Sequence, residues 1–362
     1  MKQALAAVVG VLMIAQLYYG KDFLPARGEL TDTSPAIVFG VDRDGGEVEV
    51  TLVLHNAEQG GEGKMKPEDG DDGGEENNAV ISARAPTAAA ALQKIRRRCA
   101  KSVTTGAVAF FIIGEKAAEE LHALAGFLVR DNSFSLTSQV FIAKDGAREL
   151  LGGADPESWI GGLDIYGEDS GNAAISSPYR LLELLRDLSG GGDFTVPVLL
   201  KGQEKDGILP DGYAVIKNGG PAGYIGREAA RGYHLLTGKP VESVLDIQLP
   251  AGTAALRVEK ARVSCDFNFS DAALTGIHAV VRVTVGAEET PAGPAGLEKA
   301  AAGVLREEIE RVLALREQWG SDFLGLSGRL RMRHPVRWER MADRERIIAE
   351  TPVTVEIICT VR

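Results

Sequence analysis

Hydrophobic and polar positions follow a helical period at the start of the last stretch of the chain, residues 297–362. Apolar residues recur there every three or four positions, with Glu and Arg between them, which predicts an amphipathic helix. Its apolar positions are Leu297, Ala301, Val304, Leu305, Ile309, Val312 and Leu313. The segment 320–326, a predicted turn at 334–338 and an alternating run at 353–361 follow. The alternation predicts a closing strand.

Turn residues join a first pair of predicted strands. Residues 37–41 and 47–56 alternate as strands on either side of an Asp-Arg-Asp-Gly-Gly sequence at 42–46, which predicts a hairpin. The Asp42-x-Asp44 spacing also resembles the start of a calcium loop. The later positions of such a loop do not carry the required ligands here, so the turn is favoured.

A second hairpin is predicted at Asn218-Gly219, between a strand at 213–217 and a helix at 227–236. The glycine-rich segment 218–226 superficially suggests a phosphate-binding loop. Such a loop needs Gly-Lys-Ser/Thr at the helix start, where this chain has Gly-Arg-Glu, so the hairpin is favoured.

The remaining pattern alternates between strands and amphipathic helices. Strands are expected at 79–84, 108–113, 136–143, 195–201, 263–270 and 277–285, and helices at 115–130, 146–151 and 179–188. A further helix follows Thr87, its expected N-cap. That helix has a basic outer face made by Lys94, Arg96, Arg97, Arg98 and Lys101. The face suits anionic lipid headgroups or, as the plainer interpretation, solvent.

These elements predict an α+β protein of three mixed α/β domains, with mainly antiparallel or mixed sheets packed by amphipathic helices. An N-terminal hydrophobic export or anchor segment, 1–21, precedes them. The expected domains are 22–158, 159–248 and a β-β-α-β domain at 249–362. Residues 58–76 are rich in Gly, Glu and Asp without an apolar period, and they predict a disordered acidic loop.

The first residues have the pattern of an export signal. Lys2 precedes an apolar run from Ala4 to Tyr19, and Lys21 ends it. An uncleaved anchor is favoured over a cleaved signal peptide because Met13 and a Tyr pair stand where the peptidase needs small residues. A buried N-terminal helix is a weaker alternative, since the run has no polar face. The bias of positive charge toward the cytoplasm then places the chain after Lys21 on the exported side.

Composition and charge narrow the function classes. The 362 residues carry a formal net charge of −11, which disfavours nucleic-acid binding because phosphate contacts need a basic field. Three cysteines and five histidines are scattered along the chain, so neither a disulfide framework nor a metal site is expected. No catalytic motif is present. We therefore predict no catalytic residue, no cofactor and no enzyme.

Three aromatic residues near the C-terminal turn are the candidate partner-binding residues: Phe323, His334 and Trp338. Aromatic side chains beside loops often anchor interfaces. The alternative for each is that it packs a helix end onto the sheet, because large aromatic side chains are mostly buried.

Blocks of sequence in a fixed order run along the exported part of the chain. They are 79–92, 108–115, 138–147, 212–225, 231–239, the Asp-Phe-Leu-Gly-Leu segment at 322–326, Pro335-x-x-Trp338 and 353–357. In this order they resemble the C-subunit family of spore germinant receptors, the Ger(x)C membrane-associated proteins.

The resemblance implies a three-domain α+β protein on the outer face of the inner spore membrane, without catalytic activity. It implies a role in nutrient-triggered germination together with integral-membrane partner subunits of the A and B type. Members of the family usually carry a lipid-modified Cys after the signal segment. Here Lys21 follows Gly20, so lipidation is not predicted, and the apolar run is expected to be the anchor. The acidic loop at 58–76 is also unlike the compact connection of the family.

Other functions stay open beside the leading hypothesis of a non-enzymatic receptor subunit. The alternative is a free-standing, membrane-anchored extracytoplasmic protein that binds a small solute, which a convergent polar pocket would favour. A hydrolase is the third, and no motif supports it.

Overall fold

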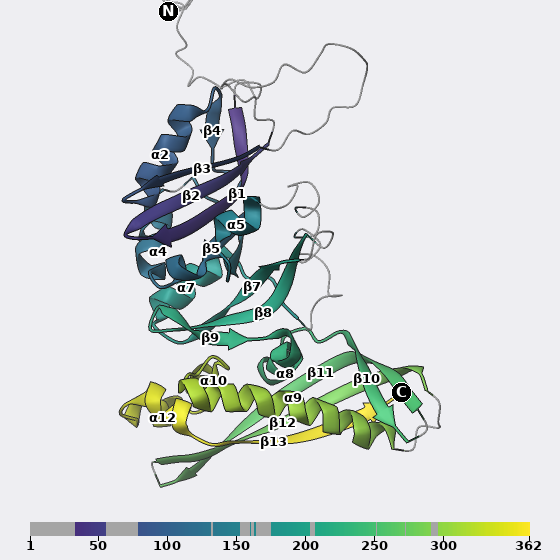
Figure 1. Cartoon of the computed structure of the whole chain (residues 1–362). Coiled ribbons are helices and arrows are strands. Elements are labelled where there is room, and N and C mark those ends of the chain that lie inside the picture. The colour runs from purple at the N-terminus through teal and green to yellow at the C-terminus, as the bar shows by residue number, and fades with distance from the viewer. Residues whose placement is uncertain are drawn as a thin grey trace, which may run out of the picture.

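The computed structural model describes residues 33–55, 79–131, 133–152, 160, 163, 175–202, 207–250, 252–271, 273–290 and 296–362. The predicted export segment and acidic loop, and Gly20 and Lys21 with them, lie outside these residues. The described elements form one sheet of nine strands and one of four. Figure 1 shows the larger sheet above the smaller one, with helix α8 between them.

The larger sheet is mixed. Its order is β3-β2-β1-β5-β6-β7-β8-β9, and β4 pairs with β1. Strands β1, β5, β6 and β7 run parallel to their neighbours in that series, while β2, β3, β8 and β9 pair antiparallel. The strands are β1 (Thr33–Asp44), β2 (Glu47–Leu54), β3 (Ala79–Ala85), β4 (Ser102–Thr104), β5 (Phe110–Gly114), β6 (Gln139–Ala143), β7 (Phe194–Lys201), β8 (Ile208–Lys217) and β9 (Gly220–Ile225).

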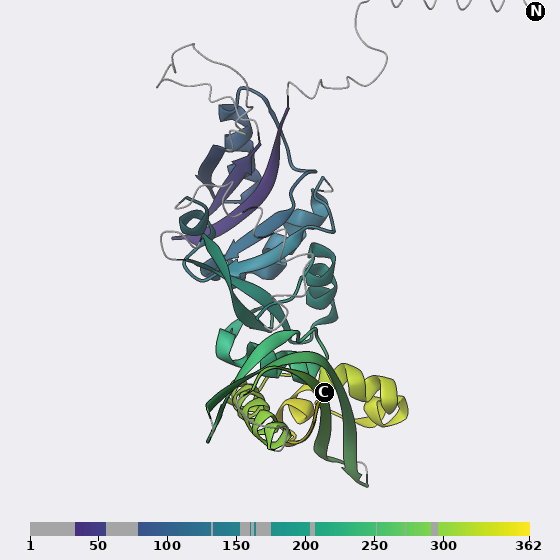
Figure 2. The same ribbon diagram turned by 90° about the vertical axis from the view of Figure 1, so that its right-hand side faces the viewer.

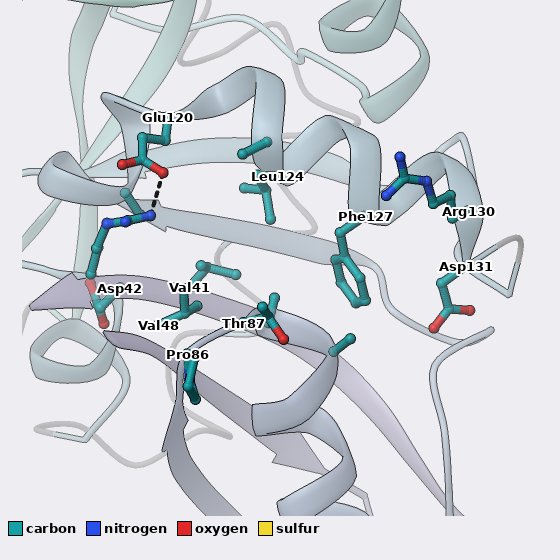
Figure 3. A pocket seen from close by; sticks show the side chains of 15 residues that line it. Val41, Asp42, Val48, Pro86, Thr87, Glu120, Leu124, Phe127, Arg130 and Asp131 are labelled. Carbon is teal, nitrogen blue, oxygen red and sulfur yellow. Dashed lines mark hydrogen bonds and ion pairs between the residues drawn. The ribbon is translucent and has the colours of Figure 1, made fainter. Parts of the chain in front are cut away.

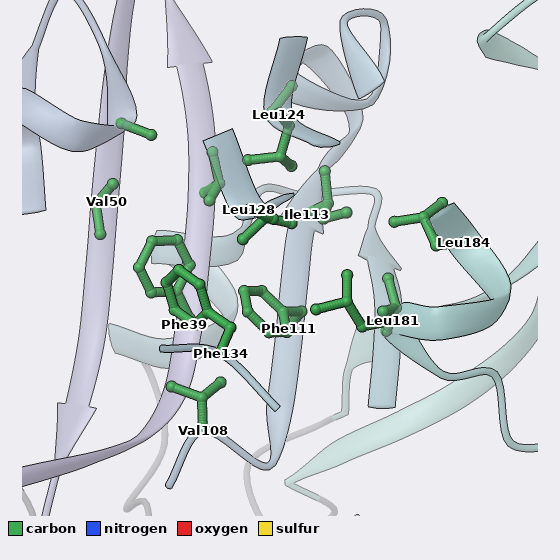
Figure 4. Close-up of a cluster of buried hydrophobic side chains, with 14 of the residues drawn as sticks. Phe39, Val50, Val108, Phe111, Ile113, Leu124, Leu128, Phe134, Leu181 and Leu184 are labelled. Atoms are coloured by element: carbon green, nitrogen blue, oxygen red, sulfur yellow. The ribbon is translucent and has the colours of Figure 1, made fainter. Parts of the chain in front are cut away.

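Helices cover both faces of this sheet, so its central strands β5 and β6 are apolar on both sides. Figure 1 shows α2, α4 and α7 on one side and α5 on the other. On the first side Phe39, Phe111 and Phe134 pack with ring centroids 5.1–5.4 Å apart (Figure 4). The helices are α2 (Ala88–Arg98), α3 (Glu115–Ala118), α4 (Leu121–Arg130), α5 (Ala147–Gly152) and α7 (Leu181–Gly190).

Both predicted hairpins are confirmed. Strands β1 and β2 pair from Asp44 and Glu47 onward, and Gly45 and Gly46 adopt positive φ values of 55° and 92° in the turn. Strands β8 and β9 likewise pair across Asn218-Gly219, whose φ values are 53° and 81°. The N-cap of α2 is also confirmed, since the Thr87 side chain accepts a hydrogen bond from the amide of Ala90.

The helix predicted at 115–130 is wrong in one respect, because it is two helices, α3 and α4. The chain leaves the helical conformation at Glu120, with φ −123° and ψ 39°, where its carboxylate pairs with Arg43 of β1. The turn predicted at 334–338 is a short helix instead. Proline is well suited to a first helical position because the helix needs no N–H there.

The smaller sheet has the order β10-β11-β12-β13, and it is also mixed. The closing strand β13 runs parallel to β12, with Val281 opposite Ile357. Helix α9 provides the crossover between them and packs along the sheet (Figures 1 and 2). The elements are α8 (Arg227–Thr237), β10 (Ser243–Leu249), β11 (Gly252–Ser270), β12 (Ala273–Glu289), α9 (Leu297–Trp319), α10 (Leu326–Arg333), α11 (Pro335–Arg340), α12 (Arg344–Glu350) and β13 (Val353–Val361). The prediction of mixed sheets packed by amphipathic helices is confirmed.

Strand β8 contributes side chains to two cores. Ala214 and Ile216 on one face belong to the core of the larger sheet, and Tyr213 and Val215 on the other face belong to the core around α8, α9 and the smaller sheet. The sheets do not follow the expected domain limits, because β6 pairs with β7 across residue 158 and β10 joins β11 across residue 249. The division into three domains stays a prediction about folding units.

No helix within the described ranges is both long enough and apolar enough to cross a membrane.

Candidate functional site

The three aromatic residues selected from the sequence lie in different surroundings. Phe323 is only 4% exposed, and its ring centroid lies 5.9 Å from that of Trp319 and 6.1 Å from that of Tyr233. His334 and Trp338 are half-buried beside β11. The structure therefore leaves His334 and Trp338 partly exposed on one short segment, and it places Phe323 in the core. Their role at a partner interface stays a prediction.

His334 and Trp338 attach helices α10 and α11 to the smaller sheet. The His334 ring lies edge-on to Phe269, with centroids 5.3 Å apart, and the amide of Trp338 donates to the His334 carbonyl at 2.9 Å. The guanidinium of Arg344 lies 5.3 Å from the centre of the Trp338 ring. The His334 ring thus packs on β11, and the Trp338 ring packs against the core of the smaller sheet.

Asp322 has a structural role that the sequence did not reveal. Its carboxylate accepts hydrogen bonds from the amides of Leu326 and Ser327 at 2.9 and 2.8 Å, which satisfies unpaired donors at the start of α10. Its own amide donates to the carboxylate of Asp193, in the larger sheet's half of the molecule, at 2.9 Å. Burial raises the pKa of the Asp322 carboxyl. A capping Asp a few residues before a helix is the signal that would have identified it.

A chain of buried polar groups lies where the larger sheet meets α8. The Tyr213 hydroxyl is 2.6 Å from Nε2 of His234 and 3.0 Å from Oγ of Ser177, and Nζ of Lys239 donates to the same Oγ at 2.9 Å. The Nδ1 atom of His234 bonds the Pro240 carbonyl, which can only accept, so we assign the proton to Nδ1. The Tyr213 hydroxyl then donates to Nε2.

Burial sets the protonation of this polar chain. Burial lowers the pKa of His234 to about 4, so the ring is neutral at pH 7. It also lowers the pKa of the Lys239 ammonium. The hydrogen bonds of this polar chain make it a structural connection between α8 and the segment before α7.

A groove opens on the larger sheet between α4 and the start of α2 (Figure 3). Its volume is about 670 Å³, within the range of small-molecule sites. Leu124 and Phe127 point from α4 toward Val41 and Pro86 on the opposite wall. The middle of the groove is therefore apolar.

Charged residues lie at the two ends of this groove. Arg43 and Glu120 form an ion pair at one end, where their side chains are 35% and 46% exposed. Arg130 and Asp131 lie at the other end (Figure 3). The carboxylate of Asp42, also in the lining, accepts from the amides of Ala147 and Arg148, so it caps α5.

The groove offers an apolar surface with charged ends to a ligand. Its lining includes no Ser, Cys or His, and the hydroxyl of Thr87 is occupied as the helix cap. Within the described ranges, no group of three or more His, Cys, Asp or Glu side chains could hold a metal ion. An elongated molecule with an apolar middle and charged ends matches the groove best. Sequence reasoning missed it because its walls come from separate segments.

The fold is that of a mixed α/β protein with two mixed sheets, and it carries an apolar groove with charged residues at its ends. Residues 26–201 match the model of the spore germination protein N-terminal domain, and residues 211–362 match that of the spore germination B3/GerAC-like C-terminal domain. The chain belongs to this family of spore germination proteins, the GerAC-like germinant receptor C-subunits, as the ordered sequence blocks predicted.

A solved structure has a similar fold over nearly its whole length. The crystal structure of the GerBC protein superposes with a TM-score of 0.60 at 14% sequence identity, over 89% of this chain and 96% of that one. Comparison with curated protein sequences gave no match. The fold is thus shared with a spore germination protein although few residues are identical.

Proposed function

We propose that this chain is a non-enzymatic, membrane-associated C-type subunit of a spore nutrient germinant receptor, acting with integral-membrane A- and B-type subunits. The observation that carries the proposal is the ordered match of both family models, from residue 26 to residue 362. The GerBC-like fold over 89% of the chain supports it.

Co-purification tests the assembly. A tagged copy expressed in sporulating cells is extracted from spore membranes with mild detergent, and the bound proteins are identified by mass spectrometry. Multi-spanning receptor subunits recovered in a constant ratio would support the proposal. Their absence, while the tagged protein itself is recovered intact from the same membranes, would contradict it.

The location on the outer face of the inner spore membrane is part of the proposal. The apolar run at 4–19 supports an anchor, because an export segment that is not cleaved holds the following chain at the membrane. Intact mass of the membrane-extracted protein tests this point. A mass of 38.5 kDa supports a retained anchor, and the loss of about 20 residues would show a cleaved signal peptide.

The groove favours a second candidate function, that of a membrane-anchored solute-binding protein. Its volume of about 670 Å³ suits a small solute. Thermal melting with a panel of nutrients tests this function. A rise in Tm that disappears in Ala123→Phe, which fills the groove, would support it. An equal rise in the variant would place the binding elsewhere.

A further inference from the structure

We propose that helices α10 and α11 dock against an anionic lipid surface through a face made by exposed Arg331, Met332, Val336, Arg337 and Arg340, here called the arginine face. The inference rests on the proposed membrane association of this chain. It adds the surface that faces the lipid and the chemistry of its contact.

The arginine face has a charge opposite to that of the chain as a whole. Residues 326–340 contain five arginines and a single acidic residue, Glu339, whereas the 362 residues together carry a net charge of −11. Two of the arginines are used internally, because Arg329 donates to the Leu236 carbonyl and Arg333 to that of Cys265. Within the described ranges the other three have no acidic partner, so their charge is available to an anionic ligand.

Exposed apolar side chains lie on the same two helices. Met332 is 77% exposed, more than any other large apolar side chain within the described ranges, and Val336 is 60% exposed. Successive helical residues are about 100° apart, so a residue two positions away lies on nearly the opposite side. Met332 is two positions from buried Leu330, and Val336 and Arg340 are each two positions from half-buried Trp338. These side chains therefore point away from the protein.

Exposed apolar side chains with arginines next to them along the chain are the pattern of a helix that lies in a membrane interface. Its apolar side chains enter the boundary between headgroups and acyl chains, and its basic side chains bind anionic headgroups. The Arg337 guanidinium lies 4.1 Å from the centre of the Phe269 ring, which holds it beside the face while it keeps its charge.

The shape favours lipid over an acidic protein partner. Protein interfaces seat their central side chains in well-packed pockets. The hollow beside Met332 and Arg333 has a volume of about 190 Å³, below the range of about 300–1,000 Å³ for ligand pockets. The hollow is thus too small to seat the anchor side chains of a protein partner, whereas exposed apolar side chains can enter a fluid surface without one.

Helix α2 provides a comparison within the same chain. It carries Arg96, Arg97 and Arg98 near its end, but no large apolar side chain is exposed along it within the described ranges. Arg98 also donates to the Ser82 carbonyl at 3.4 Å. It has the charge of the arginine face without its exposed apolar side chains, so it is the matched control.

An environment-sensitive fluorophore at position 332 tests the proposal on the full chain. The probe is attached to Met332→Cys, in a background with Cys99→Ser and Cys359→Ser, and the protein is tethered by its own N-terminal segment to vesicles of phosphatidylcholine with or without phosphatidylglycerol. A second probe at Val129→Cys, 62% exposed in the parent chain, is the control position. We expect a blue shift at position 332 only, and only with phosphatidylglycerol.

Charge variants then test whether the arginines of the arginine face make the contact with the lipid. Arg331→Gln with Arg340→Gln should lower the ratio of docked to undocked protein about thirtyfold and leave Tm unchanged. Arg96→Gln with Arg97→Gln should leave the shift in place. Equal losses from both pairs would show non-specific attraction and overturn the proposal.

Two further outcomes also decide against the arginine face. A probe that shifts equally on pure phosphatidylcholine, or only after partner subunits are added, would assign the face to another contact. Failure of the proposed membrane association looks different, because the protein would then not sediment with the vesicles. If only the docking of the arginine face is wrong, the protein still sediments with the vesicles, but the fluorescence at position 332 is not shifted.

Discussion

Single polar side chains, buried or half-buried, hold the ends of helices in this protein. A helix end leaves backbone groups without partners, and side chains from distant segments supply them. Asp42 caps α5, and Asp322 caps α10. Arg316 donates to the carbonyls of Ile348 and Thr351 at the end of α12, while Nζ of Lys217 donates to two carbonyls at the end of α9. Each of these hydrogen bonds joins two elements, so removing any of them should lower the free energy of unfolding.

Asp322→Ala removes two such hydrogen bonds at a buried position. We expect it to lower the free energy of unfolding by about 2 kcal/mol, because the amides of Leu326 and Ser327 lose their acceptor. Urea denaturation followed by circular dichroism measures the change. Asp322→Asn keeps one acceptor oxygen and should cost less. Equal stability of the Ala variant and the parent chain would disprove the capping role.

His234 should make stability depend on pH. Its pKa is lowered from 6.5 to about 4 in the folded protein, so the unfolded chain binds more protons between these values. The contribution is complete above pH 6.5 and is lost as the pH falls toward 4. A shift of this size corresponds to about 3 kcal/mol.

The pH effect is measured by urea denaturation between pH 4 and 7. The raised pKa values of Asp42 and Asp322 act in the opposite direction, so His234→Asn is needed as the reference. Subtracting its profile should leave a rise in stability with pH that ends near 6.5. A flat difference would mean that His234 is not buried in its neutral form.

At the scale of elements, α8 and α9 pack so closely that only glycine fits at one position. A Cβ added to Gly232 would lie 2.5 Å from the Glu308 carbonyl oxygen on α9. Beside this contact Arg231 forms a two-pronged ion pair with Glu308. The crossing of the two helices thus depends on a small residue and on a charge pair next to it.

Gly232→Ala should force α8 and α9 apart and lower the free energy of unfolding by about 1–3 kcal/mol. Gly303→Ala is the matched control on α9, because nothing lies within 4 Å of its added Cβ. That control should be neutral or stabilise by up to about 1 kcal/mol, since Ala favours a helix interior. Thermal melting of both variants measures the difference, and similar Tm values would contradict the close approach.

At the scale of the whole molecule, β8 ties the two sheets into one unit. The boundary between the two family models falls at 201–211, while β7 and β8 pair across it from Leu200 opposite Leu209 onward. Cutting there would expose Ala214 and Ile216, both fully buried in the intact chain. The two parts of the chain that match the family models are therefore not expected to be independent folding units.

Separate expression of residues 26–201 and 211–362 tests this expectation. Each fragment would carry an unpaired strand and an exposed apolar face, so we expect aggregation or loss of cooperative unfolding. Residues 26–362 should unfold in one transition. Two soluble fragments that each melt cooperatively, at the temperatures of two steps in the longer chain, would show separate domains instead.

Much of the secondary structure follows from the sequence alone because its causes are local. Gly45-Gly46 and Asn218-Gly219 tolerate positive φ, so both hairpins could be predicted. The apolar period of 297–313 identified α9 for the same reason, since residues three and four apart share a helix face. The ordered blocks also identified the family correctly.

Only the tertiary structure revealed the groove, the break between α3 and α4 and the burial of single residues, because these features depend on contacts between residues far apart in the sequence. Arg43 and Glu120 are 77 positions apart, so neither the groove nor the break between α3 and α4 has a local signal. The burial of Phe323 and the exposure of Met332 depend on how α10 packs on β11 and α8, although both lie in one polar and aromatic stretch. Local conformation is set by neighbours along the chain, whereas exposure is set by neighbours in space. For that reason the sequence pointed to the segment at 322–340, and only the fold separated its core residues from its free face.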